Sequence, residues 1–393
     1  MTDTEVCIVG AGPAGASLSI FLSNKKIPHV LLDKAKFPRD KICGDGITVD
    51  VMNSLKRMGN GMLEDFLEHS EMDPCWGFAF HSPKGKQIRY DFKDAGFPYA
   101  PFFTAKRLEL DNYLVSKLNP NYCTFLSESK VTGINRSSDK IELTYKKKDG
   151  ESTVSCKIII GAEGEKPIVT RFLGLDHYRE KEHLIGALRV YYKGVKGFHE
   201  NRHLEFFYDK NLLPGYFWAF PLPNGEANVG LGMTSTAISN RKANLKTLLS
   251  DIIENHPVVS EMFENAEALE NTRGWGLPTA TSKRLVAGDR YALIGDAAGM
   301  IEPFTGKGIG PGMVSGRLAA EHIENALKTG DYNLMPYHHH IYKYYSSEIK
   351  VGYGLQKTLK YPFVLNNVIS LSNLAAFKNW SHQTMVKSWK QWM

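Results

Sequence analysis

The sequence has few cysteines, and none of them forms a recognisable pattern. Among its 393 residues are 5 cysteines, an odd number, and no two are spaced as C-x-x-C. An odd number of cysteines argues against a disulfide framework, and the missing C-x-x-C spacing argues against a zinc ribbon. We therefore expect a protein of a reducing compartment, the cytoplasm.

Long apolar runs are also absent. No stretch reaches the length of about eighteen apolar residues that a membrane-spanning helix needs. The first apolar segment, Val6 to Leu22, is interrupted by glycines and a proline, so it does not resemble a secretion signal. Hydrophobic residues make up 42% and charged residues 23% of the chain, which excludes bulk disorder. The sequence predicts a globular protein that is soluble or at most peripheral to a membrane.

Positive charge is concentrated near the C-terminus. The net charge is +6, and residues 337–393 hold seven lysines and one acid, Glu348, so the rest of the chain is near neutral. The same segment contains Trp380, Trp389 and Trp392. Two interpretations stay open: contact with an anionic membrane surface, or a solvated face with aromatic packing. We expect no nucleic-acid partner, because no nucleic-acid-binding motif accompanies these lysines.

The N-terminal segment has the pattern of a nucleotide-binding βαβ unit. The β-branched run at residues 5–9 predicts a buried strand, the glycine-rich run at residues 10–15 a turn, and the apolar pattern of residues 16–22 a helix. A second predicted strand, residues 29–32, ends at Asp33. The spacing from Gly15 to this acid fits a dinucleotide site.

Each residue type in this turn has a physical reason to be there. Gly10 permits a tight turn, Gly12 lets backbone N–H groups approach a diphosphate, and Gly15 lets the helix lie close to the strand. Pro13 suits a first helical turn. The acid Asp33 can accept hydrogen bonds from ribose hydroxyls and repels a 2′-phosphate, which favours FAD or NAD over NADP.

Two later segments repeat the strand-then-glycine pattern. Residues 291–298 predict a strand that ends in Gly295-Asp296, and the glycine-rich run 303–310 precedes a helix predicted from about 312 to 327. Residues 158–164 predict another strand and turn. Asp296 can accept a hydrogen bond from a ribityl hydroxyl, or simply cap the turn. The glycine-rich helix start can offer N–H groups to a ring that gains negative charge.

Taken together, these segments resemble the FAD-dependent oxidoreductases built like para-hydroxybenzoate hydroxylase, and within them the geranylgeranyl reductase family. The motifs that carry the resemblance are the first glycine turn, the loop Cys43-Gly44-Asp45-Gly46, Arg107 before a predicted helix, the turn 161–164, and the stretch from Gly295 to Ile309. Residues 216–221 and 228–232 resemble the Y-x-W-x-F-P and N-V-G-x-G segments of the reductase branch.

The resemblance implies an α/β fold in three parts. A Rossmann-like FAD-binding domain is expected from residues 1–74, 105–175 and 270–335, with a substrate domain of antiparallel sheet inserted as residues 75–104 and 176–269. Residues 336–393 are expected to form a helical C-terminal extension. Alternating apolar residues in 184–192 and 203–208 favour sheet in the inserted domain on their own terms.

The resemblance also implies which residues contact FAD. They are Gly10, Gly12, Pro13, Ala14, Gly15, Asp33, Lys34, Arg39, Cys43, Gly44, Arg107, Val131, Glu163, Gly295, Asp296, Gly306, Gly308 and Ile309. Three positions depart from the family pattern: Glu163 stands where aspartate is usual, Pro167 where serine is frequent, and Lys307 where the reductases usually carry glutamate. Lys307 is expected to alter the charge beside the flavin. The electron donor stays open between NAD(P)H and a reduced protein carrier.

The expected reaction is transfer of hydride from flavin N5 to a C=C bond of an isoprenoid or other long apolar substrate. Tyr216, Trp218, Phe220 and Pro221 are candidates for the substrate wall, with core packing as the alternative. Cys43 and Asp45 are the candidate catalytic residues: the thiol either shapes the pocket or helps to deliver a proton, and Asp45 is an alternative acid.

Other functions remain to be weighed. A flavin monooxygenase on the same fold and a non-catalytic binder of flavin and an apolar ligand both stay open. A halogenase is excluded because the W-x-W-x-I-P signature is absent. We expect no metal site: the run at residues 338–340 has three adjacent histidines, which point in different directions on a helix.

Overall fold

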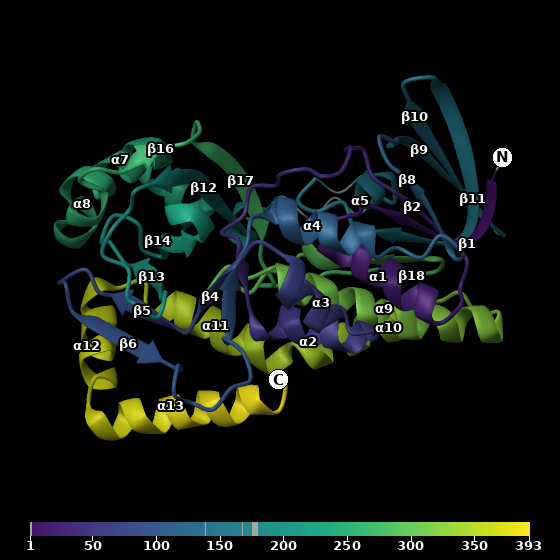
Figure 1. Ribbon diagram of the computed structural model, residues 1–393. Helices are drawn as coiled ribbons and strands as arrows, with labels where there is room; N and C mark the ends of the chain where they lie inside the picture. Colours follow the sequence, from purple (N-terminus) through teal and green to yellow (C-terminus); the bar gives the residue numbers. More distant parts are fainter. Residues whose placement is uncertain (1, 138, 167, 175–179) are drawn as a thin grey trace.

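The chain folds around a mostly parallel sheet and a mostly antiparallel sheet, with helices on their faces (Figure 1). The computed structural model describes residues 2–137, 139–166, 168–174 and 180–393. Pro167, one of the departures from the family pattern, lies outside these described residues. In the first sheet, neighbouring strands run β18 (Ala287–Gly288), β19 (Tyr291–Leu293), β11 (Gly150–Gly161), β1 (Thr2–Val9), β2 (His29–Leu32) and β8 (Cys123–Leu126). Strands β9 (Lys130–Arg136) and β10 (Ile141–Lys147) extend β11 as an antiparallel flap.

The central strands are apolar on both faces because helices cover them. Val6 to Ile8 of β1 and residues 158–160 of β11 are fully buried, as expected for a parallel sheet between two layers. The surrounding helices are α1 (Pro13–Asn24), α2 (Val49–Met58), α3 (Met62–His69), α4 (Arg107–Ser116), α5 (Ile168–Phe172) and α9 (Ile309–Thr329).

Helices α1 and α9 pack closely through small residues. A Cβ atom at Gly316 of α9 would lie 2.7 Å from the carbonyl oxygen of Ala14 and 3.0 Å from the nitrogen of Leu18. A Cβ at Gly295 would lie 2.9 Å from the Ala14 methyl group. The two predicted glycine turns, far apart in the sequence, therefore lie side by side.

The second sheet is built almost entirely from the middle of the chain. Its order is β16 (Glu267–Ala268), β12 (Leu184–Lys193), β15 (Glu226–Thr234), β14 (Gly215–Leu222), β13 (Leu204–Phe207), β5 (Gly77–His81) and β6 (Gln87–Asp91), with β17 (Arg273–Pro278) also paired to β12. Helices α6 (Ser235–Arg241), α7 (Leu245–Asn255) and α8 (Pro257–Phe263) accompany it. A small sheet of β3 (Gly46–Ile47), β7 (Phe102–Thr104) and β4 (Asp73–Cys75) lies between the two.

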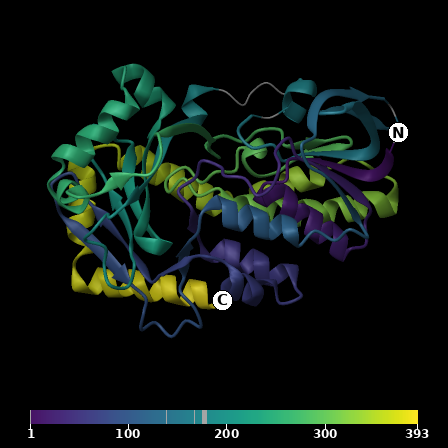
Figure 2. The same ribbon diagram turned by 45° about the horizontal axis from the view of Figure 1, so that its top comes forward.

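The C-terminal segment is helical and returns to the second sheet. It forms α10 (Met335–Tyr344), α11 (Ser346–Thr358), α12 (Pro362–Ser372) and α13 (Ala375–Lys390), of which α12 and α13 form an outer edge of the molecule (Figures 1 and 2). The Tyr90 and Ser381 hydroxyls lie 2.8 Å apart, and His382 Nε2 lies 2.9 Å from the carbonyl oxygen of Asp91. Helix α13 thus covers the edge strand β6, which would otherwise expose unpaired backbone groups.

The predicted architecture is confirmed: an α/β fold with a mostly parallel sheet, an antiparallel sheet and C-terminal helices are all present. The helix predicted from about 312 to 327 is α9, which begins slightly earlier, at Ile309. The division into domains stays a prediction; β17, from the 270–335 segment, pairs with the second sheet. In the part of the chain that the structure describes, no helix is long and apolar enough to cross a membrane.

Candidate functional site

A cavity of about 690 Å³ brings together most of the residues that the sequence singled out. Of those, the residues that line it are Gly12, Pro13, Ala14, Cys43, Gly44, Asp45, Arg107, Tyr216, Trp218, Phe220, Gly295, Asp296, Gly306, Gly308 and Ile309. The remaining candidates lie outside its lining: Gly10, Gly15, Asp33, Lys34, Arg39, Val131, Glu163 and Pro221.

The first glycine turn forms one end of the cavity. A Cβ at Gly10, whose φ is +105°, would lie 2.4 Å from the carbonyl oxygen of Ala162, and a Cβ at Gly15 would lie 1.9 Å from that of Gly10. Both glycines are therefore required by packing. A Cβ at Gly12 would lie 3.7 Å from Arg39 Nη2, its nearest described contact outside the chain neighbours. Space therefore remains in front of the first turn of α1. That space suits a phosphate group at a helix N-terminus.

Asp33 holds this turn through the backbone. Its carboxylate is buried and accepts hydrogen bonds from the nitrogens of Ala11 and Ala35, both at 2.8 Å. Contact with a ribose through its remaining lone pairs stays a prediction. Nearby, Lys34 is exposed, and Val131 is buried on β9.

Arg39 and Arg107 share one buried carboxylate. Arg107 donates to both oxygens of Asp111 at 2.7 Å, and Arg39 pairs with the same carboxylate at 3.1 Å. Because Asp111 neutralises part of this charge, Arg107 can lie buried at the cavity wall.

The second glycine turn lies at the same end of the cavity. Gly295 donates its N–H to the Ser315 hydroxyl at 2.9 Å, and Asp296 pairs with Lys41 at 3.5 Å. Gly308 is the N-cap of α9, and none of the described side chains caps that helix. The unpaired N–H groups of this helix start can stabilise negative charge, as expected from the sequence.

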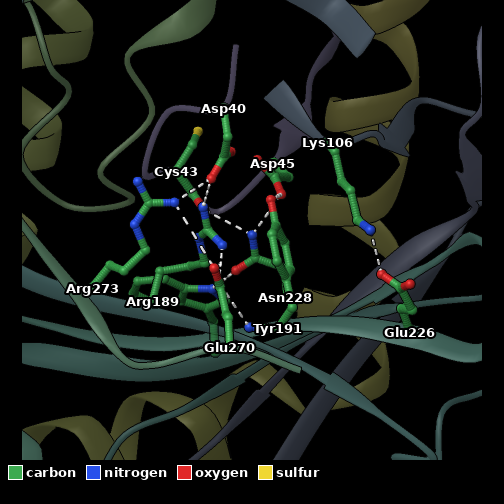
Figure 3. Close-up of polar contacts among 11 residues, drawn as sticks. Asp40, Cys43, Asp45, Lys106, Arg189, Tyr191, Glu226, Asn228, Glu270 and Arg273 are labelled. Carbon is green, nitrogen blue, oxygen red and sulfur yellow. Dashed lines mark hydrogen bonds and ion pairs between the residues drawn. The ribbon is translucent and has the colours of Figure 1, made fainter. Parts of the chain in front are cut away.

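Asp45 occupies the most constrained position in the site. Its φ is +60°, its side chain is fully buried, and Oδ2 accepts hydrogen bonds from the Tyr191 hydroxyl at 2.6 Å and from Asn228 Nδ2 at 2.8 Å (Figure 3). Asn228 Nδ2 also donates to the carbonyl oxygen of Cys43 at 2.8 Å. These bonds join the loop 43–46 to strands β12 and β15 of the second sheet.

Burial sets the protonation of this loop. Desolvation raises the pKa of Asp45 to about 6, against the hydrogen bonds of Tyr191 and Asn228, which lower it. Burial also raises the pKa of the Cys43 thiol, partly offset by the Arg107 guanidinium. Near neutral pH, a minor part of the Asp45 population is therefore protonated, while the Cys43 thiol keeps its proton.

A charged cluster supports Tyr191 from behind. Arg189 is buried, pairs with Asp40 at 2.8 Å and with Glu270, and its guanidinium lies 3.8 Å from the ring centroid of Tyr191 (Figure 3). This cluster could not be predicted from the sequence, because its members lie far apart along the chain and share no motif.

The other end of the cavity is aromatic. Trp218 lies across β15, where a Cβ at Gly230 would come within 2.3 Å of its ring, and its Nε1 donates to Asn228 Oδ1 at 2.9 Å. A Cβ at Gly44 would lie 3.5 Å from the Phe220 ring. Further aromatic residues, not identified from the sequence, line this end: Phe78, Phe80, Phe102, Phe206, Phe304 and Trp389.

Lys307 is paired with acids rather than free beside the glycine turn. Its Nζ lies 2.8 Å from Glu348 and 3.4 Å from Asp50. Burial alone lowers the lysine pKa, but these carboxylates outweigh it and raise the pKa above the ordinary value. At Glu163, burial raises the pKa to about 7, and one carboxylate oxygen accepts from Val169 N at 2.5 Å.

One set of possible metal ligands occurs among the described residues, away from the cavity. Ligand atoms of Asp91, His199 and His203 lie within 4.8 Å of one another. The two imidazole rings are stacked, with centroids 4.0 Å apart and planes 11° apart, and Asp91 accepts from Asn201 Nδ2 at 2.8 Å. In-plane lone pairs of stacked rings run side by side instead of converging, so this set is arranged as a hydrogen-bonded cluster. The run at residues 338–340 does not belong to it.

The residues present fit an extended flavin dinucleotide. Space in front of Gly12, the uncapped start of α9 and the loop 43–46 lie along one continuous cavity. Gly12 to Ala14 would hold the diphosphate, and the loop 43–46 and residues 306–309 would hold the ring system.

This assignment predicts different consequences for two glycines of the first turn. Gly12→Leu should leave the midpoint of thermal unfolding of the FAD-free protein nearly unchanged but lower FAD affinity about 100-fold, since its side chain fills the diphosphate position. Gly15→Leu should destabilise the fold itself. Gly354→Leu is the control and should keep FAD, because a Cβ at this helical position would meet no described atom within 4 Å outside its own helix backbone and chain neighbours. Full FAD affinity of Gly12→Leu, measured by titration, would contradict the assignment.

Comparison with known proteins identifies the family. Residues 3–341 match the model of the FAD binding domain. The menaquinone reductase of Mycolicibacterium smegmatis is 32% identical over 329 residues, which cover 81% of this chain and 76% of that protein. Digeranylgeranylglycerophospholipid reductase 1 of Methanosphaera stadtmanae is 26% identical over 98% of this chain and 93% of that protein.

A solved structure has the same fold. The geranylgeranyl bacteriochlorophyll reductase-like protein of Thermoplasma acidophilum superposes with a TM-score of 0.81 at 22% identity, covering 94% of this chain and 91% of that one. The resemblance noted from the sequence motifs is thus confirmed, and with it FAD as the cofactor. The chain belongs to the FAD binding domain family and is an FAD-dependent oxidoreductase of the geranylgeranyl and menaquinone reductase type.

Proposed function

We propose that this oxidoreductase reduces carbon–carbon double bonds in the isoprenoid chain of a long apolar substrate. The observation that carries the proposal is the aromatic end of the cavity, which is continuous with the loop 43–46. The names of the relatives support it, since menaquinone and digeranylgeranylglycerophospholipid are both isoprenoid compounds.

The cavity walls provide what an unactivated alkene requires. Reduced FAD, when bound, supplies the hydride. The alkene has no group that absorbs the incoming charge, so the protein must hold it within about 3 to 3.5 Å of the donor and exclude water. Trp218 and Phe220 lie close to Gly44 of the loop 43–46, since a Cβ there would come within 3.7 Å of both rings. They are placed to position the alkene and to exclude water. Pro221 lies behind them, and its carbonyl oxygen accepts from the Thr104 hydroxyl.

Asp45 is the proposed source of the proton that completes the reduction. Its Oδ2 accepts two hydrogen bonds, so in the neutral acid the proton resides on Oδ1, which has no hydrogen-bond partner among the described residues. With a pKa of about 6, part of the carboxyl population holds this proton near neutral pH. Cys43, on the same loop, is proposed to shape the pocket.

The reaction type is tested without oxygen. Protein with photoreduced FAD, mixed anaerobically with geranylgeranyl or menaquinone-type substrates, should regain the absorbance of oxidised flavin and yield a product with one fewer double bond. A monooxygenase would form product only after oxygen is admitted, and a binding protein would leave the flavin reduced. Either result would contradict the proposal. The electron donor, NAD(P)H or a reduced protein carrier, can then be sought by its ability to replace photoreduction.

The role of Asp45 predicts a pH dependence. A proton donor acts in its neutral form, so the rate of flavin reoxidation by substrate should fall about tenfold per pH unit above its pKa, near pH 6. Asp45→Asn should lower the rate about 100-fold or more and remove this dependence. Tyr191→Phe removes a hydrogen bond that favours the charged form, so it should move the fall to higher pH. An unchanged profile in Asp45→Asn would exclude the role.

A further inference from the structure

The exposed apolar side chains of this protein are concentrated on its C-terminal helices. Of the 15 large hydrophobic side chains that are exposed in the described residues, 11 lie between residues 344 and 392. We call these the C-terminal patch: Tyr344, Val351, Leu355, Tyr361, Phe363, Val368, Leu371, Leu374, Phe377, Trp380 and Trp392. Scattered single exposed residues need no explanation, but a concentration of this size marks an interaction surface.

Side chains on α12 and α13 are among the most exposed members of the patch. Phe363 is 75% exposed, Leu371 61% and Trp380 63%. The opposite faces of these helices are used for packing: Leu365 and Ile369 of α12 and Val386 of α13 are buried in the apolar core beside the second sheet. Because the packing faces are already satisfied, the outward apolar residues are not needed to attach the helices to the sheet.

Charge in the same segment is almost entirely positive: within residues 344–393 the one acid is Glu348, which pairs with Lys307. Residues 349–393 contain six lysines and no aspartate or glutamate. Five of these lysines are exposed: Lys350, Lys357, Lys360, Lys387 and Lys390. A surface that combines Trp, Phe and Leu with lysine alone is complementary to an anionic lipid surface, where the apolar groups enter the boundary of the acyl chains and the ammonium groups stay at the headgroups.

The cavity opens at this patch. Tyr344, Val351, Leu355 and Trp392 belong to the patch and also line the cavity. They lie on α10, on α11 and just beyond α13, and Met385 and Trp389 of α13 continue the lining inward. An apolar path thus leads from the exposed rim to Trp218 and Phe220.

We propose that the C-terminal patch docks this protein on an anionic phospholipid bilayer, with the mouth of the cavity at the lipid surface. The proposal rests on the proposed function in one respect: an isoprenoid substrate would pass from the bilayer to the cavity without crossing water. An isoprenoid chain has a large apolar surface, which is buried both in the bilayer and in the cavity. Exposing that surface to water during transfer would be strongly unfavourable.

Flotation of the FAD-bound protein with lipid vesicles tests docking. The protein should bind vesicles of phosphatidylcholine mixed with phosphatidylglycerol, bind pure phosphatidylcholine weakly, and lose binding as salt rises. The triple variant F363S/L371S/W380S should bind about tenfold less tightly for each residue replaced. The matched control, L269S/L285S, changes two side chains that are each 46% exposed elsewhere, and it should bind like the unaltered protein.

A second variant avoids dependence on apolar substitutions. K357Q/K360Q should weaken binding to the anionic vesicles about fivefold for each lysine and leave binding to neutral vesicles unchanged. Equal vesicle affinity of the triple variant and the control would overturn the proposal. A second result would also overturn it: neither the unaltered protein nor the triple variant binds vesicles, and the unaltered protein is a dimer while the triple variant is a monomer. The patch would then join two copies of the chain.

Vesicle binding is measured without turnover, so the two proposals fail separately. A protein that binds vesicles through the patch but reduces no isoprenoid would contradict the proposed function alone. A protein that reduces isoprenoids in detergent but ignores vesicles would contradict docking alone.

Discussion

The site depends on the hydrogen bonds that the buried carboxylate of Asp45 accepts. Its two hydrogen bonds, from Tyr191 of β12 and Asn228 of β15, connect the loop 43–46 to the second sheet. Burying a charged carboxylate costs free energy unless it is paired with polar groups or protonated. Asp45 accepts two hydrogen bonds, and part of its population is protonated near neutral pH. The same environment that fixes the loop raises the pKa of Asp45 to about 6. One arrangement therefore sets both the geometry of the cavity and the availability of a proton.

The local parts of this arrangement could be predicted from the sequence. Gly10, Gly12 and Gly15 follow a strand at short spacing, and two of the demands on them arise within the turn itself: the positive φ of Gly10 and the approach of Gly15 to the Gly10 carbonyl oxygen. The two glycine turns are separate motifs in the sequence, and the approach of Gly295 to Ala14 in the structure shows that they meet. The aromatic wall was recognised in part, as Trp218 and Phe220, because its segments resemble a family pattern.

Other features depend on contacts between distant segments. Arg189, Asp40 and Glu270 carry no motif, so the charged cluster behind Tyr191 appears only once the sheets are assembled. The part played by α13 in the cavity was also missed, since lysines and tryptophans at a C-terminus are equally compatible with a solvated helix. For Asp33 and Val131 the structure gives positions, and their contacts with FAD stay predictions.

The molecule thus combines two environments in one cavity. At the glycine turns, backbone N–H groups and paired charges suit a dinucleotide; at the opposite end, rings of Phe, Trp and Tyr suit a hydrocarbon chain. The boundary between them is the loop 43–46. The second sheet and the C-terminal helices supply the apolar half of the cavity, and the first sheet with its glycine turns supplies the other half.

A crystal structure of the protein with FAD and an unreactive isoprenoid analogue would test this account most directly. The account predicts the flavin ring beside the loop 43–46 and the start of α9, with the isoprenoid chain between the ring and Trp218. A flavin ring remote from this loop, or an isoprenoid chain bound outside the aromatic end of the cavity, would contradict it.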